Sequence, residues 1–211
     1  MTRLLSCRWV KGQHRTSADS TRQRWLVFSG TIWTCATTII TAALLILLTS
    51  ESSTLAEPLE LAIKANYLER FAPFIEWPPT SFATADASLT ICVLANDPLA
   101  PLLEQAAAGQ KDGSRLIIVR RLGQTDSAAQ CQIFYFEPDD PVGKQIAENL
   151  QNRPVLTVTS AAAEQQTPAI ITFVIDQNRV RFDIDNTAAS NAGLNIGSNL
   201  LALARTVRRT P

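Results

Sequence analysis

The sequence predicts an α/β domain whose mostly parallel sheet carries helices on both faces and ends in a β-hairpin followed by a helix. Short, nearly continuous apolar segments alternate along the chain with amphipathic segments of helical period. This alternation is typical of a parallel sheet that is covered on both sides. Near the C-terminus, two apolar segments flank one short polar turn, which is typical of an antiparallel hairpin.

The first helix of this domain is predicted over residues 58–77. Pro58 suits its first turn, where the missing N–H costs nothing, and Pro78 is expected to end it by forcing Trp77 out of the α region. One apolar stripe recurs every four positions: Leu59, Ile63, Tyr67, Phe71 and Ile75. A second stripe lies beside it: Leu61, Ala65, Leu68 and Ala72. With two apolar stripes, one face could remain for another subunit or a partner.

The middle of the domain is predicted to alternate between strands and helices. Its strands are rich in β-branched and aromatic residues and cover 88–97, 115–122, 131–138 and 154–160. Asp97 is expected to cap a helix that reaches about Ala108, and Asp140 to cap a second helix over 139–151, because Asp is a favoured N-cap. A flavodoxin-like order, 2-1-3-4-5, would make the first and third strands parallel neighbours.

The C-terminal part is predicted to hold the hairpin and the last helix. Strands 169–175 and 179–184 flank the turn 176–178. A helix from about Thr187 to Val207 would pack through a stripe of Ala192, Ile196, Leu200, Leu203 and Val207. Its basic end, with Arg205, Arg208 and Arg209, would suit the negative pole of the helix dipole.

Residues 1–56 are predicted to be a membrane-targeting segment, and 57–211 the exported domain. The 26 residues from 25 to 50 carry no formal charge and end in a dense leucine core, "AALLILL", with basic residues before it. This pattern and the small residues of "TLA" at 54–56 favour a signal peptide cleaved after Ala56. A permanent membrane anchor stays open as the alternative, because about 20 apolar residues span a bilayer. The domain is exported in either case.

Composition excludes several function classes for the exported domain. The chain has 19 basic and 19 acidic residues, but six of the basic ones precede residue 57, so the remainder is mildly acidic and suggests no nucleic-acid partner. The one histidine, His14, lies in the leader, which argues against imidazole-based catalysis and ordinary zinc sites. No phosphate-binding glycine loop occurs. We therefore expect no enzyme, no cofactor and no metal.

A candidate ligand edge is predicted where the parallel strands end. Asn96, Asp97, Arg120 and Glu137 all lie at or after the carboxyl end of a predicted strand, which is where open α/β sheets bind ligands. Capping and solvated loops explain the carboxylates equally well, and a solvent-facing arginine explains Arg120. A small-ligand-binding or transport accessory domain is therefore the second function class that the sequence supports.

Cys92 and Cys131 are the two cysteines of the exported domain, because Cys7 and Cys35 lie in the leader. In an oxidising compartment they are more often bonded than free. If their strands are neighbours, the spacing between adjacent strands permits a disulfide. Two buried thiols that pack as small apolar groups are the alternative.

The stretch "YLERFAPFIEWPP", residues 67–79, is a candidate interface with a partner or a second copy. Trp and Phe next to a rigid proline corner are good interface anchors. The candidate residues are Phe71, Phe74, Ile75, Trp77 and Pro78. An ordinary core helix with Trp77 closing its end is the alternative.

Residues 57–211 resemble the YfiR/HmsC family of periplasmic regulators. The resemblance rests on six segments in order: "IKANYLERFAPFIEWP" (63–78), "ICVLANDPLAPLL" (91–103), "VRRL" (119–122), "CQIFYF" (131–136), "RPVLTVTS" (153–160) and "NRVRFDIDNTAASNAGLNIGSNLLALA" (178–204). The sequence departs from the family at two places. "QTPAIITFV" (166–174) lacks the family's Gly-Gly pair, which concerns the turn geometry and function of that loop, and Asp185 replaces a common Asn, which adds a charge at the entrance to the last helix.

The resemblance implies a protein that regulates by binding. Such proteins repress a membrane-bound diguanylate cyclase by binding its periplasmic sensor domain, which lowers cyclic-di-GMP and biofilm output, and they release it under envelope or redox stress. An outer-membrane lipoprotein can sequester the repressor. We also expect a homodimer.

Overall fold

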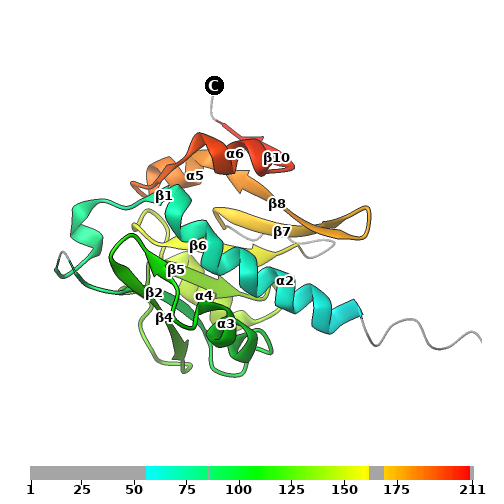
Figure 1. Cartoon of the computed structure of the whole chain (residues 1–211), viewed down its shortest axis with the longest axis horizontal. Helices are drawn as coiled ribbons and strands as arrows, with labels where there is room; N and C mark the ends of the chain where they lie inside the picture. Colours follow the sequence, from blue (N-terminus) through cyan, green and yellow to red (C-terminus); the bar gives the residue numbers. More distant parts are fainter. Residues whose placement is uncertain (1–55, 85, 162–168, 210–211) are drawn as a thin grey trace, which may run out of the picture. The chain divides into compact units, whose positions relative to one another are not determined.

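The computed structural model describes residues 56–84, 86–161 and 169–209 of the 211-residue chain (Figure 1). The predicted targeting segment, with its two interpretations, lies outside these residues except for Ala56. None of the described helices is long and apolar enough to cross a membrane. All described residues belong to one unit, Ser53–Pro211.

One eight-stranded sheet forms the centre of this unit, in the order β10-β8-β7-β6-β5-β2-β4-β3. The strands are β2 (Leu89–Leu94), β3 (Lys111–Asp112), β4 (Arg115–Leu122), β5 (Ile133–Phe136), β6 (Leu156–Ser160), β7 (Ile171–Asp176), β8 (Arg179–Asp185) and β10 (Thr206–Arg208). Strands β4, β2, β5, β6 and β7 are parallel neighbours. The predicted order 2-1-3-4-5 is therefore confirmed, as is the α/β class.

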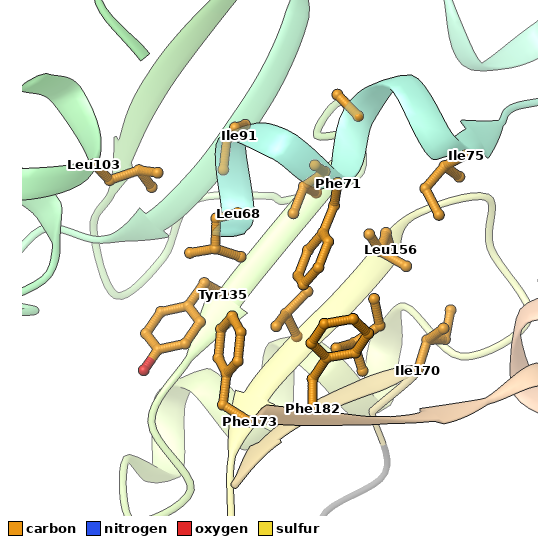
Figure 2. Packing of buried hydrophobic residues seen from close by; sticks show 14 of the residues in the cluster. Leu68, Phe71, Ile75, Ile91, Leu103, Tyr135, Leu156, Ile170, Phe173 and Phe182 are labelled. Atoms are coloured by element: carbon orange, nitrogen blue, oxygen red, sulfur yellow. The ribbon is translucent and has the colours of Figure 1, made fainter. Parts of the chain in front are cut away.

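Helices cover both faces of the sheet (Figure 1). Helices α2 (Ala56–Phe71) and α3 (Ala100–Ala107) pack on one face, where Leu68 and Leu103 join the larger apolar cluster. Helix α4 (Pro141–Asn149) packs on the other face, where Ala147 joins a smaller cluster that includes both cysteines. Phe71 stacks on Phe173 at the centre of the larger cluster, with ring centroids 5.9 Å apart (Figure 2).

Helix α2 ends earlier than predicted, and its second stripe is not free. The α-helix stops at Phe71 and continues as a 3₁₀ turn, Ala72–Phe74, followed by β1 (Ile75–Glu76). The cause is Pro73, which lacks the N–H that the next helical turn needs. Ala65, Leu68 and Ala72 of the second stripe are almost fully buried. Ile63 and Tyr67 of the first stripe pack against the same cluster, so neither stripe leaves the free face that was predicted.

The hairpin of β7 and β8 is confirmed, with Gln177 and Asn178 in its turn. Both have positive φ, +48° and +59°, and the strands pair from Asp176↔Arg179 onward. Two successive residues in the left-handed region match the tight turn whose twist suits a hairpin.

A helix follows the hairpin, as predicted, but it does not extend over 187–207 as a single element. The segment forms α5 (Asn186–Asn191), β9 (Asn195–Ile196), α6 (Ser198–Leu203) and then β10. Gly193, at φ +74°, supplies the left-handed residue that turns the chain after α5. Strand β9 then pairs antiparallel with β1, which fixes the end of the α2 segment against this region.

The C-terminal arginines pair with the hairpin and do not serve a helix pole. Arg205 donates to both carboxylate oxygens of Asp183, and Arg208 lies 3.1 Å from Asp185 Oδ2. Asp185 also accepts a hydrogen bond from the Ala188 amide at 2.9 Å and so caps α5. These contacts hold β10 beside β8.

Candidate functional site

A polar cavity lies at the carboxyl ends of β2 and β5. The strand order reverses between these two strands, because the chain leaves β2 toward β4 and leaves β5 toward β6. Such a reversal is the usual ligand position in open α/β sheets. The cavity has a volume of about 580 Å³, and its lining includes Glu57, Glu60, Lys64, Asn96, Asp97, Glu137, Asp139 and Asp140.

Three of the four residues of the predicted ligand edge lie together here. Asn96, Asp97 and Glu137 line the cavity, whereas Arg120 does not. Arg120 donates to the Ser127 carbonyl at 2.6 Å, in the loop that connects β4 to β5. This part of the prediction is wrong because Arg120 serves a local turn.

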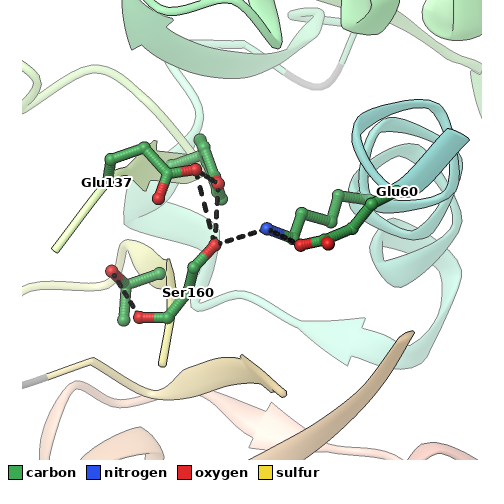
Figure 3. A network of polar contacts seen from close by, with 6 residues as sticks. Glu60, Glu137 and Ser160 are labelled. Carbon is green, nitrogen blue, oxygen red and sulfur yellow. Dashed lines mark hydrogen bonds and ion pairs between the residues drawn. The ribbon is translucent and has the colours of Figure 1, made fainter. Parts of the chain in front are cut away.

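Lys64 of α2 joins the helix to this edge of the sheet. Its ammonium is buried, lies 2.7 Å from Glu60 Oε1 and donates to Ser160 Oγ at 2.9 Å (Figure 3). Ser160 Oγ lies 3.0 Å from the Tyr135 hydroxyl, which donates to Glu137. Lys64 lies outside both apolar stripes of the predicted helix, and its position one turn after Glu60 is the sequence signal that points to it.

Burial and charge shift the acidity of two groups in this network. Burial, followed by repulsion from Glu137 and Asp140, raises the pKa of Asp97 to about 6, although the Leu99 amide and Lys64 act against this. Burial, then the charge and hydrogen bond of Glu137, raise the pKa of Tyr135. Asp97 accepts the Leu99 amide at 2.8 Å and so holds the turn before α3.

The carboxylates of the cavity outnumber its cation, Lys64. Within the described residues, no group of three or more His, Cys, Asp and Glu side chains could hold a metal ion. The arrangement can bind a small polar ligand by hydrogen bonds and charge. Asp139 and Asp140 border it, and Asp140 is engaged as the predicted cap of α4, with Val142 and Gly143 amides at 2.8 and 3.1 Å.

A second cavity, of about 650 Å³, lies on the sheet face beside α4 and α5. Its floor includes Thr157, Thr159 and Thr172, and the ion pairs of Arg205 and Arg208 form part of its wall. Thr159 donates to the Phe136 carbonyl at 2.9 Å, and Thr157 Oγ1 accepts the Ile170 amide at 3.1 Å. No predicted site residue lines this cavity.

The disulfide between Cys92 and Cys131 is present, as predicted. The two Cα atoms lie 5.9 Å apart, and both residues are buried, at 0 % and 2 % exposure. The bond joins Cys92 in β2 to Cys131, which lies two residues before the start of β5, on the face covered by α4. The neighbouring parallel strands supply the geometry on which the prediction depended.

The candidate interface divides into core and surface residues. Phe71 and Ile75 are buried at 1 % and 6 % exposure, so a partner cannot reach them in this fold, which corrects that part of the prediction. Phe74, Trp77 and Pro78 are half-buried. We call these three residues the Trp77 corner.

The Trp77 corner is held against the amino end of the sheet. Trp77 Nε1 donates to the Gln132 carbonyl at 3.3 Å, and its ring meets Phe82 edge-on with centroids 6.4 Å apart. The Phe74 carbonyl accepts the Gly197 amide at 2.8 Å. A Cβ at Gly197 would lie 3.2 Å from that carbonyl oxygen, so a larger residue there would press on the corner.

Comparisons with known proteins match one family model and ten chains of solved structures, of which two distant ones follow. A conserved domain protein from Vibrio cholerae O1 biovar El Tor strain N16961 is 14 % identical, with a TM-score of 0.44 over 70 % of this chain and 60 % of that chain. An ABC domain in complex with L-Trp from Streptococcus pneumonia is 13 % identical, with a TM-score of 0.46 over 68 % and 62 %. The chain thus spans about three fifths of each. The comparison with curated proteins finds no match.

The family model described as YfiR/HmsC-like matches residues 61–205. This range includes β1 to β9, the disulfide, Lys64 and the whole Trp77 corner. Because the match covers more than half of the sequence, the chain belongs to the YfiR/HmsC-like family.

Proposed function

We propose that this chain is a periplasmic protein that binds the periplasmic sensor domain of a membrane-bound diguanylate cyclase and represses it. Membership in the YfiR/HmsC-like family carries the proposal, because it supports a periplasmic regulatory role in broad terms. The chain acts by binding and not by catalysis. A second copy of the chain and an outer-membrane lipoprotein are its further proposed partners.

The Trp77 corner is the surface that we assign to the cyclase. Half-buried aromatic side chains beside prolines lose little conformational freedom on binding, which makes them good anchors. Trp77 is held by Gln132 and Phe82, and Pro78 and Pro79 restrict the backbone that follows it. The corner therefore presents a pre-organised apolar surface.

A binding measurement with matched variants tests this assignment. The affinity of the full chain for the cyclase sensor domain is measured for wild type, Trp77→Ala and Phe74→Ala, with urea unfolding recorded for each. Truncation of an anchor costs about 2 kcal/mol or more, roughly 30-fold in Kd. Ile118→Ala, at an apolar residue of β4 that is 40 % exposed, is the control and should bind like wild type. Folded corner variants that retain full affinity would refute the assignment.

The proposed location is the periplasm, which the chain reaches by export with removal of its leader. The mature protein is expected to begin near Glu57, and mass spectrometry of the envelope fraction reads the N-terminus directly. Peptides from residues 1–24 in the stable protein would instead support the anchored form.

Binding of a small ligand is the second candidate function, favoured by the polar cavity at the strand-order reversal. A metabolite that binds there stabilises the folded chain by mass action, without any protein partner. Thermal unfolding of the full chain with a panel of envelope metabolites measures this. Glu137→Gln should abolish the stabilisation, whereas Ile118→Ala should preserve it; equal stabilisation of both variants would place the ligand elsewhere.

A further inference from the structure

The second cavity lies over a polar part of the central sheet. On β6, β7 and β8, successive side chains point to opposite faces of the sheet. Those on the α2 side belong to the larger apolar cluster: Leu156, Val158, Ile171, Phe173 and Phe182. Those on the other side line the cavity and are mostly polar: Thr157, Thr159, Thr172, Asp183 and Asp185. This part of the sheet therefore has one apolar face, in the core, and one polar face, in the cavity.

Four of the polar side chains form one row across four strands. The strand register pairs Thr159 with Thr172, Thr172 with Asp183, and Asp183 with Thr206. Paired residues on neighbouring strands point to the same face, and each strand lies about 4.8 Å from the next. All four residues line the cavity. Three hydroxyls and one carboxylate thus follow one another along its floor.

The hydroxyls of this floor have unused hydrogen-bonding capacity. Thr172 is half-buried, and its hydroxyl makes no hydrogen bond with any described residue. Thr157 is 6 % exposed; its Oγ1 accepts the Ile170 amide, but its hydroxyl proton has no acceptor among the described residues. A buried donor without a partner costs stability. A molecule in the cavity that exchanges hydrogen bonds with these two hydroxyls would therefore be favoured.

The charged side chains of the cavity are paired with one another. Arg205 donates to both carboxylate oxygens of Asp183, and Arg208 lies 3.1 Å from Asp185 Oδ2. The described lining of the cavity has no other charged side chain, so its formal charge is zero. A charged ligand would have to separate one of these pairs and leave the other member without its partner, which is costly. The cavity therefore favours a neutral ligand.

The shape and the rest of the lining narrow the class of ligand further. The volume of about 650 Å³ lies within the usual range of small-molecule sites. Ala147, Leu150 and Val155 of the smaller apolar cluster form an apolar wall, while Asn152 and Asn191 add amides. A purely apolar ligand would leave the polar floor without partners. A ligand rich in hydroxyl groups meets the floor best, because each hydroxyl both donates and accepts.

We propose that this cavity binds a neutral sugar, as a free mono- or disaccharide. Its hydroxyl groups exchange hydrogen bonds with Thr157, Thr172 and Asp183, and its C–H surface lies against the apolar wall. The site is separate from the Trp77 corner and from the polar cavity at the strand-order reversal. It does not depend on the proposed repression, because sugar binding is measured without a protein partner.

Calorimetric titration of the full chain tests this proposal. The neutral probes are glucose, galactose, N-acetylglucosamine, maltose and trehalose, and the charged probes are glucuronate and glucosamine. At least one neutral sugar should bind with a Kd of about 1 mM or tighter, and the two charged sugars should bind more weakly than glucose. Failure of every neutral sugar to bind would overturn the proposal. Tighter binding of either charged sugar than of glucose would overturn it as well.

Variants of one floor residue place the bound sugar in this cavity. Thr172→Val removes only the hydroxyl and keeps the branched shape, so it should weaken binding of the tightest sugar about fivefold to tenfold while urea unfolding stays unchanged. Thr172→Ser keeps the hydroxyl and should bind like wild type. Thr84→Val is the matched control, because Thr84 is exposed and does not line the cavity. Equal affinity of Thr172→Val and Thr84→Val would overturn the assignment.

A change of charge tests why the ligand is neutral. Asp183→Asn leaves Arg205 without its carboxylate partner and so gives the cavity an unpaired positive charge. The folded variant should bind glucuronate more tightly than glucose, the reverse of the order expected for wild type. An unchanged preference for glucose in this variant would contradict the argument from the paired charges.

Discussion

The carboxyl group of Asp97 lines the polar cavity at the end of β2. Burial raises its pKa there from 3.8 to about 6. A raised pKa means that the folded chain binds the proton more tightly than the unfolded chain. The ionised carboxylate therefore costs stability above about pH 6, and this cost vanishes below pH 3.8. Between these values, the contribution of Asp97 to the free energy of unfolding falls as pH rises.

Asp97→Asn should remove this pH dependence while keeping an acceptor for the Leu99 amide. Relative to wild type, the variant should gain about 1–2 kcal/mol between pH 4 and pH 7, less than the full 1.36 kcal/mol per pK unit because solvent screens the site. Urea unfolding at four pH values measures the difference. Stability curves that stay parallel across this range would contradict the assigned pKa.

At the scale of single residues, the sequence predicted the roles of those residues whose partners are close by in the chain. Asp140 was recognised as a cap because Pro141 and a helical pattern follow it. Lys64 and Gln132 were not singled out, because their partners, Ser160 and Ser81, lie 96 and 51 residues away. Such contacts depend on tertiary packing that residue type alone does not reveal.

Among the elements, helix α4 lies very close to β5 at Gly143. A Cβ there would lie 2.7 Å from Phe136 Cβ, which cannot rotate away because it is attached to the backbone. Gly143→Ala should therefore lower the free energy of unfolding by about 1–2 kcal/mol, since overpacking outweighs the better helix propensity of Ala.

Gly123→Ala is the matched control for this prediction. Its Cβ would meet Asp126 Oδ2 at 3.5 Å, an ordinary contact, so stability should stay within about 0.5 kcal/mol of wild type. Urea unfolding of both variants gives the comparison. If Gly143→Ala were as stable as Gly123→Ala, this result would contradict the close contact between Gly143 and Phe136.

Most element types were predictable, but the end of α2 and the division of the C-terminal segment into α5, β9, α6 and β10 were not. The apolar period identified α2, but Pro73 ended it before Pro78 could, and the paired strand β1 followed. In the C-terminal segment, Ala192, Ile196 and Leu200 are all buried as the helical stripe required. They are buried from separate elements, because Gly193 turns the chain and β9 pairs with β1. Periodicity alone could not distinguish these arrangements.

For the whole molecule, the strand order followed from the alternation of strands and helices. The parallel order placed β2 beside β5 and so brought Cys92 and Cys131 within bonding distance. The same order brought Asn96, Asp97 and Glu137 to one cavity, whereas Arg120 was engaged by a loop. Topology therefore predicted which strand ends meet, but not where each side chain points.

The disulfide should contribute much of the stability of the whole domain. Closing the loop between residues that are 39 apart stabilises by roughly 3–4 kcal/mol in the chain-entropy model. Reduction should therefore lower the Tm of the full chain by roughly 6–16 °C. The double variant Cys92→Ala/Cys131→Ala should melt at one temperature with or without reductant. A wild-type Tm that reduction leaves unchanged would contradict this stabilisation.

Cellular cyclic-di-GMP, measured in cells that make or lack this chain, tests the proposed repression by the whole molecule most directly. Deletion of its gene should raise cyclic-di-GMP, and the wild-type gene should restore the low level. Trp77→Ala, made at wild-type abundance, should fail to restore it, while Ile118→Ala should succeed. Unchanged cyclic-di-GMP on deletion, in cells where the cyclase is present, would contradict the proposed repression.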